Sequence, residues 1–428
     1  MPAGPTQRRA VWSWAFYDWA NSAFATTVVA GFFPLFFKDY WNSGVSAAES
    51  TLRLGNANAL ASLAILLAAP VLGAIADRSH GRKRFLAAFA ALGVLATAAL
   101  VGVAQGQWLT AAAFFVLASV GFSGSLVFYD ALLPDVAAPE QLDRVSALGY
   151  ALGYLGGGLL FGVNVAMVIA PAWFGLPGRA MAVKLAFVSV ALWWAVFSVP
   201  LFVNVRERHK GPALGLSRAA VAGLRQLSRT ARQVRGLRMV ALFLVAYWLY
   251  IDGVDTVYRM AVDYGLSIGL SASGLMMALL LTQFVSFPAA LGFGRLAGVM
   301  GVRRAIYLAL WVYAGVIGWG YFLHDVYQFY LMALGIGLVQ GGLQSLSRSY
   351  FARMVPPGQS AEFFGFYNMM GKFAAVLGPA LVGWTAALTG SARLSILSIL
   401  LLFAAGGALL WKVDEERGRR EALAVAGP

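Results

Sequence analysis

The chain has 428 residues, of which 60% are hydrophobic and 12% charged, and its mean hydropathy is +0.73. Soluble domains carry about 25% charged residues, so this composition excludes an ordinary soluble protein and indicates an integral membrane protein. The absence of cysteine excludes a disulfide framework, thiol chemistry and a cysteine-based metal site. A net charge of +14 would suggest a nucleic-acid partner for a soluble protein, but the placement of the charges, described below, argues against one.

Apolar runs long enough to cross a bilayer as helices recur twelve times along the chain. Helices are expected because lipid offers no partners for unpaired backbone groups. The expected spans are 15–37, 55–76, 85–104, 108–131, 147–170, 181–203, 239–262, 272–293, 305–323, 327–347, 363–388 and 393–412. The predicted fold class is therefore an all-α integral membrane protein with 12 transmembrane helices.

The basic residues are distributed unevenly between the two sides of these spans. When the N-terminus is placed in the cytoplasm, the inside segments hold 25 of the 32 Lys and Arg residues. Such an excess marks cytoplasmic segments. We therefore predict a multi-pass protein of the cell (inner) membrane with both termini in the cytoplasm. The positive charge then serves topology and attraction to anionic membrane lipids, and no nucleic-acid partner is expected.

The longest connection between spans, residues 204–238, is basic and has apolar residues at helical spacing. This pattern predicts an amphipathic helix on the inner leaflet. The chain is thereby divided into an N-terminal six-helix bundle (1–203), a cytoplasmic linker (204–238) and a C-terminal six-helix bundle (239–428). A tether between the bundles is the simpler interpretation of the linker, and a regulatory partner site is the alternative.

The two halves of the chain repeat each other. The segments "GAIADRSHGRKR" (73–84) and "GRLAGVMGVRR" (294–304) follow the second and eighth spans, and both place glycines and basic residues in a short turn. Three residues of the first half recur in the second half at one constant offset: Pro139, Gln141 and Gly153 as Pro357, Gln359 and Gly371. Two pseudo-symmetric six-helix bundles are typical of secondary transporters, whose binding site lies near the midplane between the repeats.

The turn at 73–84 contains residues that could hold the inner side of the protein closed. Its two glycines allow close packing and a sharp reversal, and Asp77 can accept hydrogen bonds from backbone amides or pair with an arginine. We predict that Asp77 contacts the inner end of the eleventh span, or a nearby arginine, when the inner side is closed. The second turn has Gly298 where the carboxylate is expected, so this gate is one-sided. The predicted gating residues are Gly73, Asp77, Arg78, Gly81 and Arg82.

The segment 73–84 resembles the signature loop of the major facilitator superfamily. Four further segments, "YDWANSAFATTV", "WWAVFSVPLF", "LYIDGVDT" and "GGLQSLSRSYFARMVPPGQSAEFFGFY", resemble the vacuolar effluxer (autophagy-linked) family within that superfamily. Asp130 and Ile251 stand where that family more usually has Asn. The resemblance implies the major facilitator fold and export of small solutes, which are amino acids for its fungal vacuolar members.

Ionisable side chains inside membrane spans are costly and mark candidate functional sites. Six of the seven in this chain fall on spans one, four, seven and ten, which line the central cavity in the superfamily that the chain resembles. Asn21 shares a helical face with Asp18, and Gln344 shares one with Arg348. The candidate substrate-binding or coupling residues are Asp18, Asn21, Asp130, Asp252, Asp255, Arg259, Gln344, Arg348 and Lys372.

Several of these charges also have structural interpretations. Asp18 and Asp130 lie near the inner ends of their spans, where each could snorkel or hold a gate. Arg348 could be the partner of Asp130. Asp255 and Arg259 could form an i, i+4 pair.

Asp252 and Lys372 lie deepest in their spans. We predict that both border the cavity and that one or both contact substrate or a coupled proton. A purely structural pair is the alternative. A different kind of signal comes from Gly149, Gly153 and Gly157, whose spacing predicts close helix packing.

Enzyme motifs are incomplete in this chain. The segment around Lys372 lacks the Ser or Thr of a phosphate-binding loop, and "GFSGS" lacks the last glycine of a nucleophile elbow. The three histidines fall in loops, so no metal site or cofactor is expected.

The sequence therefore predicts a secondary active transporter, not an enzyme, that works by alternating access. Cations and carboxylates in one cavity suit an amino acid or similar zwitterion, with export favoured. Arg348, Arg259 or Lys372 would hold its carboxylate, and Asp252 or Asp18 its ammonium group. One buried aspartate could instead carry a coupled proton. The protein is expected to be a monomer. The alternatives are a lipid scramblase or flippase of the same fold and a non-transporting receptor or scaffold.

Overall fold

The computed structural model describes residues 5–79, 81–207, 237–267, 271–323, 325–373, 377–389 and 392–426. Within these ranges the chain is helical, without strands, and helices occupy all twelve expected segments. Ten of the helical segments are long and apolar enough to span a membrane. The remaining two correspond to the ninth expected span, now α12, and the eleventh, now α14 and α15. The chain is therefore a multi-pass membrane protein.

The first half begins with one long helical segment, α1 (Pro5–Ala23), η1 (Phe24–Phe32), α2 (Phe33–Phe36) and η2 (Phe37–Trp41). It continues with α3 (Ala47–Ser79), α4 (Arg82–Ala99), η3 (Leu100–Gly102), α5 (Trp108–Ala131), α6 (Leu133–Val136), η4 (Pro139–Gln141), α7 (Leu142–Ile169), η5 (Pro171–Phe174) and α8 (Arg179–Asn204).

The second half contains α10 (Arg238–Ser267), α11 (Ala272–Met300), α12 (Val302–Gly320), α13 (Val326–Ala352), α14 (Ser360–Phe373), α15 (Leu377–Thr389), α16 (Ala392–Leu397), α17 (Ile399–Trp411) and α18 (Glu415–Ala426). The reversal between α11 and α12 requires Gly301, whose φ of 89° is in the left-handed region that favours glycine. Most of the predicted 204–238 amphipathic linker lies outside the described residues.

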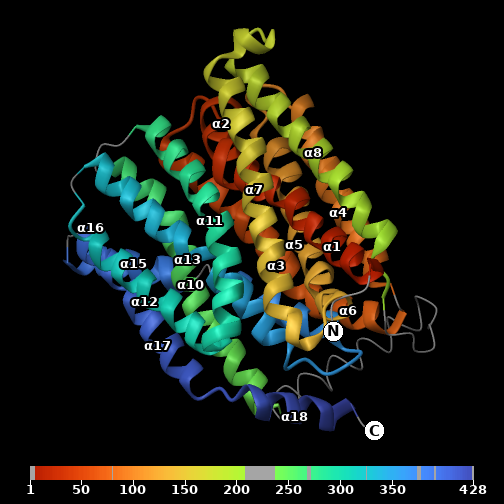
Figure 1. Ribbon diagram of the computed structural model, residues 1–428. Helices are drawn as coiled ribbons and strands as arrows, with labels where there is room; N and C mark the ends of the chain where they lie inside the picture. Colours follow the sequence, from red (N-terminus) through yellow and green to blue (C-terminus); the bar gives the residue numbers. More distant parts are fainter. Residues whose placement is uncertain are drawn as a thin grey trace.

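The helices form two bundles, α1–α8 and α10–α17, that lie side by side (Figure 1). They meet where α7 packs against α11 and α13, and where α14 packs against α3 and α5. Both chain termini lie at the same end of the molecule, which we call the terminus side, and α18 lies across that end (Figure 1). This arrangement agrees with the predicted fold of two helical bundles.

The first expected span, 15–37, was placed too narrowly. The helix begins at Pro5, ten residues earlier, and the segments Phe24–Phe32 and Phe37–Trp41 have π-helical geometry. Hydrophobicity marks only the part of a helix that meets lipid or core, so it misses the polar turns before Ala15. π-Helical segments are rare and often occur at functional sites.

The glycines of α7 pack closely against α1, as their spacing predicted. A Cβ atom on Gly149 or Gly153 would lie 2.6 Å from a side chain of α1, and one on Gly157 would lie 3.0 Å from a side chain of η1. At Gly149 that side chain is Asp18, one of the candidate functional residues. The glycines thus bring the carboxylate of α1 up to the backbone of α7.

Candidate functional site

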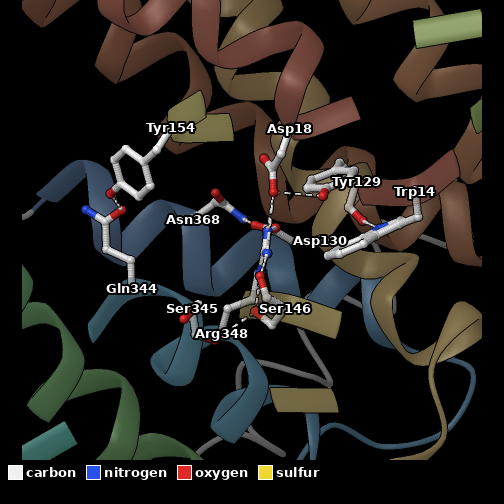
Figure 2. Close-up of polar contacts among 10 residues, drawn as sticks. All are labelled: Trp14, Asp18, Tyr129, Asp130, Ser146, Tyr154, Gln344, Ser345, Arg348 and Asn368. Carbon is white, nitrogen blue, oxygen red and sulfur yellow. Dashed lines mark hydrogen bonds and ion pairs between the residues drawn. The ribbon is translucent and has the colours of Figure 1, made fainter. Parts of the chain in front are cut away.

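Arg348 lies at the centre of a group of polar side chains between the two bundles (Figure 2). Its Nη1 lies 3.0 Å from Oδ1 of Asp130 on α5 and 3.4 Å from Oδ2 of Asp18 on α1. Its Nε donates to the hydroxyl of Ser146 on α7, and its Nη2 to the Ser146 carbonyl oxygen, each over 2.9 Å. One arginine of the second bundle is therefore held by three helices of the first.

The two carboxylates have further partners. The Tyr129 hydroxyl donates to Oδ2 of Asp18 over 2.8 Å, and the Asn368 amide of α14 donates to Oδ2 of Asp130 over 3.2 Å (Figure 2). We call Asp18, Tyr129, Asp130, Ser146, Arg348 and Asn368 the central cluster. The predicted pairing of Arg348 with Asp130 is thus present, and Asp18 joins it.

Aromatic rings surround the guanidinium group of Arg348. Its Cζ lies 4.3 Å from the ring centre of Tyr150, 4.9 Å from Trp14 and 5.5 Å from Tyr129. The rings of Trp14 and Tyr129 stack at 4.4 Å, and the Trp14 indole donates to the Tyr129 carbonyl oxygen. The rings attract the cation while keeping water away from it.

The charges of the central cluster do not balance. Two carboxylates face one guanidinium group, and only 2% of the Arg348 side chain and 8% of each aspartate side chain are exposed. Buried charges are stable only when paired and hydrogen-bonded. The cluster therefore depends on contact between the bundles, and it carries one negative charge in excess when both aspartates are ionised.

Further hydrogen bonds between the bundles lie at the start of α7, on the terminus side. The Ser349 hydroxyl of α13 and the guanidinium group of Arg353, the residue after α13, donate to the two carboxylate oxygens of Asp143, at the start of α7. Ser146 donates to the carbonyl oxygen of Ser345. Together with the central cluster, these contacts close the interface between the bundles at this end.

The predicted contact between Asp77 and the eleventh span is present. The Asp77 carboxylate accepts hydrogen bonds from the backbone N–H groups of Ala361 (3.2 Å) and Glu362 (2.9 Å), in the first turn of α14. Arg82 bridges Asp77 and Asp135 at 2.7 and 3.0 Å. The carboxylate thus satisfies N–H groups that a helix start leaves without intrahelical partners.

The two glycines predicted for the gate, Gly73 and Gly81, differ in how strongly the structure requires glycine. A Cβ on Gly73 would lie 2.3 Å from the carbonyl oxygen of Ala361, so α3 and α14 approach at this position only because it is glycine. Gly81 has φ −116°, which any residue adopts, and a Cβ there would meet only the Ser79 side chain closely. Gly81 is therefore compatible with the reversal, but its conformation and surroundings do not require glycine. Arg78 is exposed.

Asp252 on α10 is fully buried, and its closest partners are backbone N–H groups, with the Thr256 hydroxyl at 3.4 Å from Oδ1. Its two carboxylate oxygens accept hydrogen bonds from the N–H groups of Leu377 (3.0 Å) and Gly378 (3.1 Å), the first two residues of α15. Within the eleventh expected span, 363–388, the structure describes α14 up to Phe373 and α15 from Leu377, and residues 374–376 lie outside the described part. The geometry supports a structural role for Asp252 as the anchor of α15, and its contact with substrate stays a prediction.

The remaining candidates are placed as follows. Gln344 accepts a hydrogen bond from Tyr154 of the other bundle over 3.4 Å (Figure 2). Asn21 is buried one turn from Asp18, and Asp255 is half-buried on α10. The side chains of Arg259 and Lys372 lie outside the described part of the structure.

Sequence reasoning missed several residues of this interface. Asn368 carried a usable signal, because it is an amide within an apolar stretch, one helical turn before Lys372. Ser146, Tyr129 and Asp143 carried none that separates them from ordinary helix-end residues. Their role appears only once α5, α7 and α13 are brought together.

The fold is that of the major facilitator superfamily. The human organic anion transporter MFSD10 (TETRAN) superimposes with a TM-score of 0.73 at 16% identity, over 95% of this chain and 100% of that one. The proton:xylose symporter XylE gives 0.69 at 11% identity, over 98% of each chain. At these identities the likeness establishes the fold alone.

Sequence comparison identifies the family within this superfamily. The family model described as "Vacuole effluxer Atg22 like" matches residues 56–423. An uncharacterized MFS-type transporter of Bacillus subtilis, YxiO, is 38% identical over 409 residues, 94% of each chain. Autophagy-related protein 22-1 of Emericella nidulans is 22% identical over 99% of this chain and 93% of that protein. The chain belongs to the Atg22-like vacuole effluxer family, as the sequence motifs indicated.

Proposed function

We propose that the protein is a proton-coupled secondary transporter that exports a small zwitterion, such as an amino acid, across the cell membrane by alternating access. The observation that carries this proposal is the central cluster, whose cation and carboxylates belong to different bundles. The domain division predicted from sequence, with a linker between two moving bundles, supports the same cycle. In this reading the terminus side is cytoplasmic and is closed in the structure described.

The cluster offers a means of coupling to protons. Opening of the terminus side would carry Arg348 away with the second bundle and leave Asp18 and Asp130 together on the first. Two neighbouring carboxylates without a cation favour binding of a proton between them. Protonation in turn weakens their attraction to Arg348, so a proton taken up from the outer side favours opening of the terminus side, and its release to the cytoplasm favours closure.

The role of Arg348 in substrate binding needs revision. All the described hydrogen bonds of its guanidinium group go to Asp18, Asp130 and Ser146 in this conformation. The group can reach a substrate carboxylate only after these bonds break. We therefore assign Arg348 to the gate and to coupling, and leave the zwitterion to side chains nearer the midplane.

The proposal is tested by transport of labelled amino acids in proteoliposomes, with and without a pH gradient. Accumulation that requires the gradient and is lost in the Asp130→Asn variant supports a proton-coupled transporter. Transport that is equal with and without the gradient contradicts coupling. Movement of labelled lipid between leaflets without amino-acid transport would favour the lipid-handling alternative.

The topology is tested independently of substrate. Because basic residues concentrate on the terminus side, reporter fusions at Gly211 and after Arg417 should both be cytoplasmic. Alkaline phosphatase fused at either position should be inactive, and a fluorescent protein should be bright. Active phosphatase at either position would contradict the proposed orientation.

The Asp77 gate makes a conformational prediction. The chain has no cysteine, so a single added one can be labelled selectively. Ala147 on α7 is 1% exposed and faces Gly294 of the other bundle, which makes Ala147→Cys a reporter of opening. Asp77→Asn removes the charge that holds α14, and the reporter should react about tenfold faster, as expected for the loss of one charge-assisted interaction.

The matched control for this experiment is Asp39→Asn, which changes an exposed carboxylate near the opposite end of the first span. It should leave the labelling rate unchanged. Equal rates in the Asp77 and Asp39 variants would show that Asp77 does not hold the gate.

A further inference from the structure

Helix α18 is seated on the terminus-side ends of α10 and α13. A Cβ on Gly418 would lie 2.7 Å from Sδ of Met354 and 3.2 Å from Cβ of Met239, so the helices are in close contact here. The backbone N–H of Met239 donates to Oε2 of Glu421 over 3.2 Å. Ala422, one turn after Gly418, is 2% exposed. The helix is therefore docked on the second bundle.

Arg353 links this helix to the opposite bundle. Its Nη1 lies 2.8 Å from Oε1 of Glu415, the first residue of α18, and its Nη2 lies 2.5 Å from Oδ2 of Asp143 on α7. The Ser349 hydroxyl donates to the other oxygen of Asp143 over 2.6 Å. A line of three charges thus runs from α18 through α13 into the first bundle.

The shape of the arginine side chain lets Glu415 control the direction in which Arg353 points. The guanidinium group is planar and rigid, so fixing one nitrogen fixes the direction of the others. The Arg353 side chain is 20% exposed, and without Glu415 it could turn toward water. Glu415 keeps Nη2 pointed at Asp143.

We infer that Glu415 is a positioning residue for the transport cycle: acting through Arg353, it lets α18 stabilise the closed terminus side. This inference rests on the proposed alternating-access function. Glu415 and Arg353 belong to the same bundle, so their pair persists when the bundles separate and only the bond to Asp143 breaks. Arg353 is then held ready to bind Asp143 again, and undocking of α18 would release it.

The test uses the full-length chain with the Ala147→Cys reporter in proteoliposomes. Glu415→Gln keeps the shape of the side chain and removes its charge. It should raise the labelling rate about fivefold, as expected for a partly exposed charged hydrogen bond. Glu416→Gln changes the neighbouring, exposed carboxylate and should leave the rate unchanged.

A second variant tests the route. If Glu415 acts through Arg353 on Asp143, then Glu415→Gln should add nothing once Asp143→Asn is present. Additive effects, or a labelling rate equal to that of Glu416→Gln, would overturn the inference. So would a lower unfolding temperature with unchanged labelling, because that indicates a merely structural helix. Labelling requires no transported substrate, so a failure of the proposed function would not obscure the result.

Discussion

Replacing Arg348 with glutamine is expected to have the largest effect of any single substitution in the central cluster. It removes the cation that lies against the buried carboxylates of Asp18 and Asp130 in the described part of the structure. Removing one partner of a buried ion pair costs roughly 3–5 kcal/mol, because the remaining charge is left in apolar surroundings. The closed state should be lost, with a lower unfolding temperature, rapid labelling of Ala147→Cys and no transport.

The control for this variant restores the balance of charge. Arg348→Gln combined with Asp18→Asn and Asp130→Asn leaves no buried charge among these three positions, so much of the thermal stability should return. Transport should stay absent, because neither the ion pairs nor the proton-binding group remains. An Arg348→Gln protein that is as stable and as active as the natural chain would show that the cluster neither holds the interface nor takes part in the cycle.

The second large effect is expected at the start of α15, from Gly378→Ala. A Cβ at this position would lie 1.8 Å from Oγ1 of Thr256 and 2.9 Å from Oδ1 of Asp252. Overpacking in a filled interior costs typically 1–3 kcal/mol, and this overlap is severe. Gly383→Ala, on the same helix, is the matched control, since its Cβ would meet nothing within 4 Å. Thermal unfolding of the two variants should differ clearly.

The Asp252→Asn variant tests the same contact between α10 and the start of α15 by changing the carboxylate. An amide keeps one oxygen acceptor but turns a donor toward the backbone N–H groups of Leu377 and Gly378, so stability should fall by roughly 2 kcal/mol. Stability and transport should fall together. Normal stability with abolished transport would instead support the substrate or proton role that the sequence suggested for Asp252.

The sequence was most informative where a single chemical cost decides the structure. Apolar length predicted the helical segments, and the cost of burying charge singled out Asp18, Asp130 and Arg348 before their contact was known. Likewise, Asp77 and Gly73 could be assigned to a close contact because a carboxylate and a glycine in a turn have few other uses.

The sequence was least informative about contacts between helices that are distant along the chain. The contact between Asp252 and the backbone N–H of Leu377 joins residues 125 positions apart along the chain. The partners of Asp130 could not be ranked either, since Asn368 and Arg348 come from different helices of the second bundle. Periodicity describes which residues share a face, but it does not say which faces meet.

The division of the central cluster between two rigid bundles bears on how such a gate can open at all. A substitution removes one charge and leaves its partner buried without a counter-charge, whereas separation of the bundles lets water reach every side chain of the cluster at once. Hydration of Asp18, Asp130 and Arg348 would then offset most of the lost ion-pair attraction. Substitution of these side chains can therefore be strongly destabilising even though the same side chains separate in each transport cycle. During separation, the water that enters the opening takes the place of the opposite bundle.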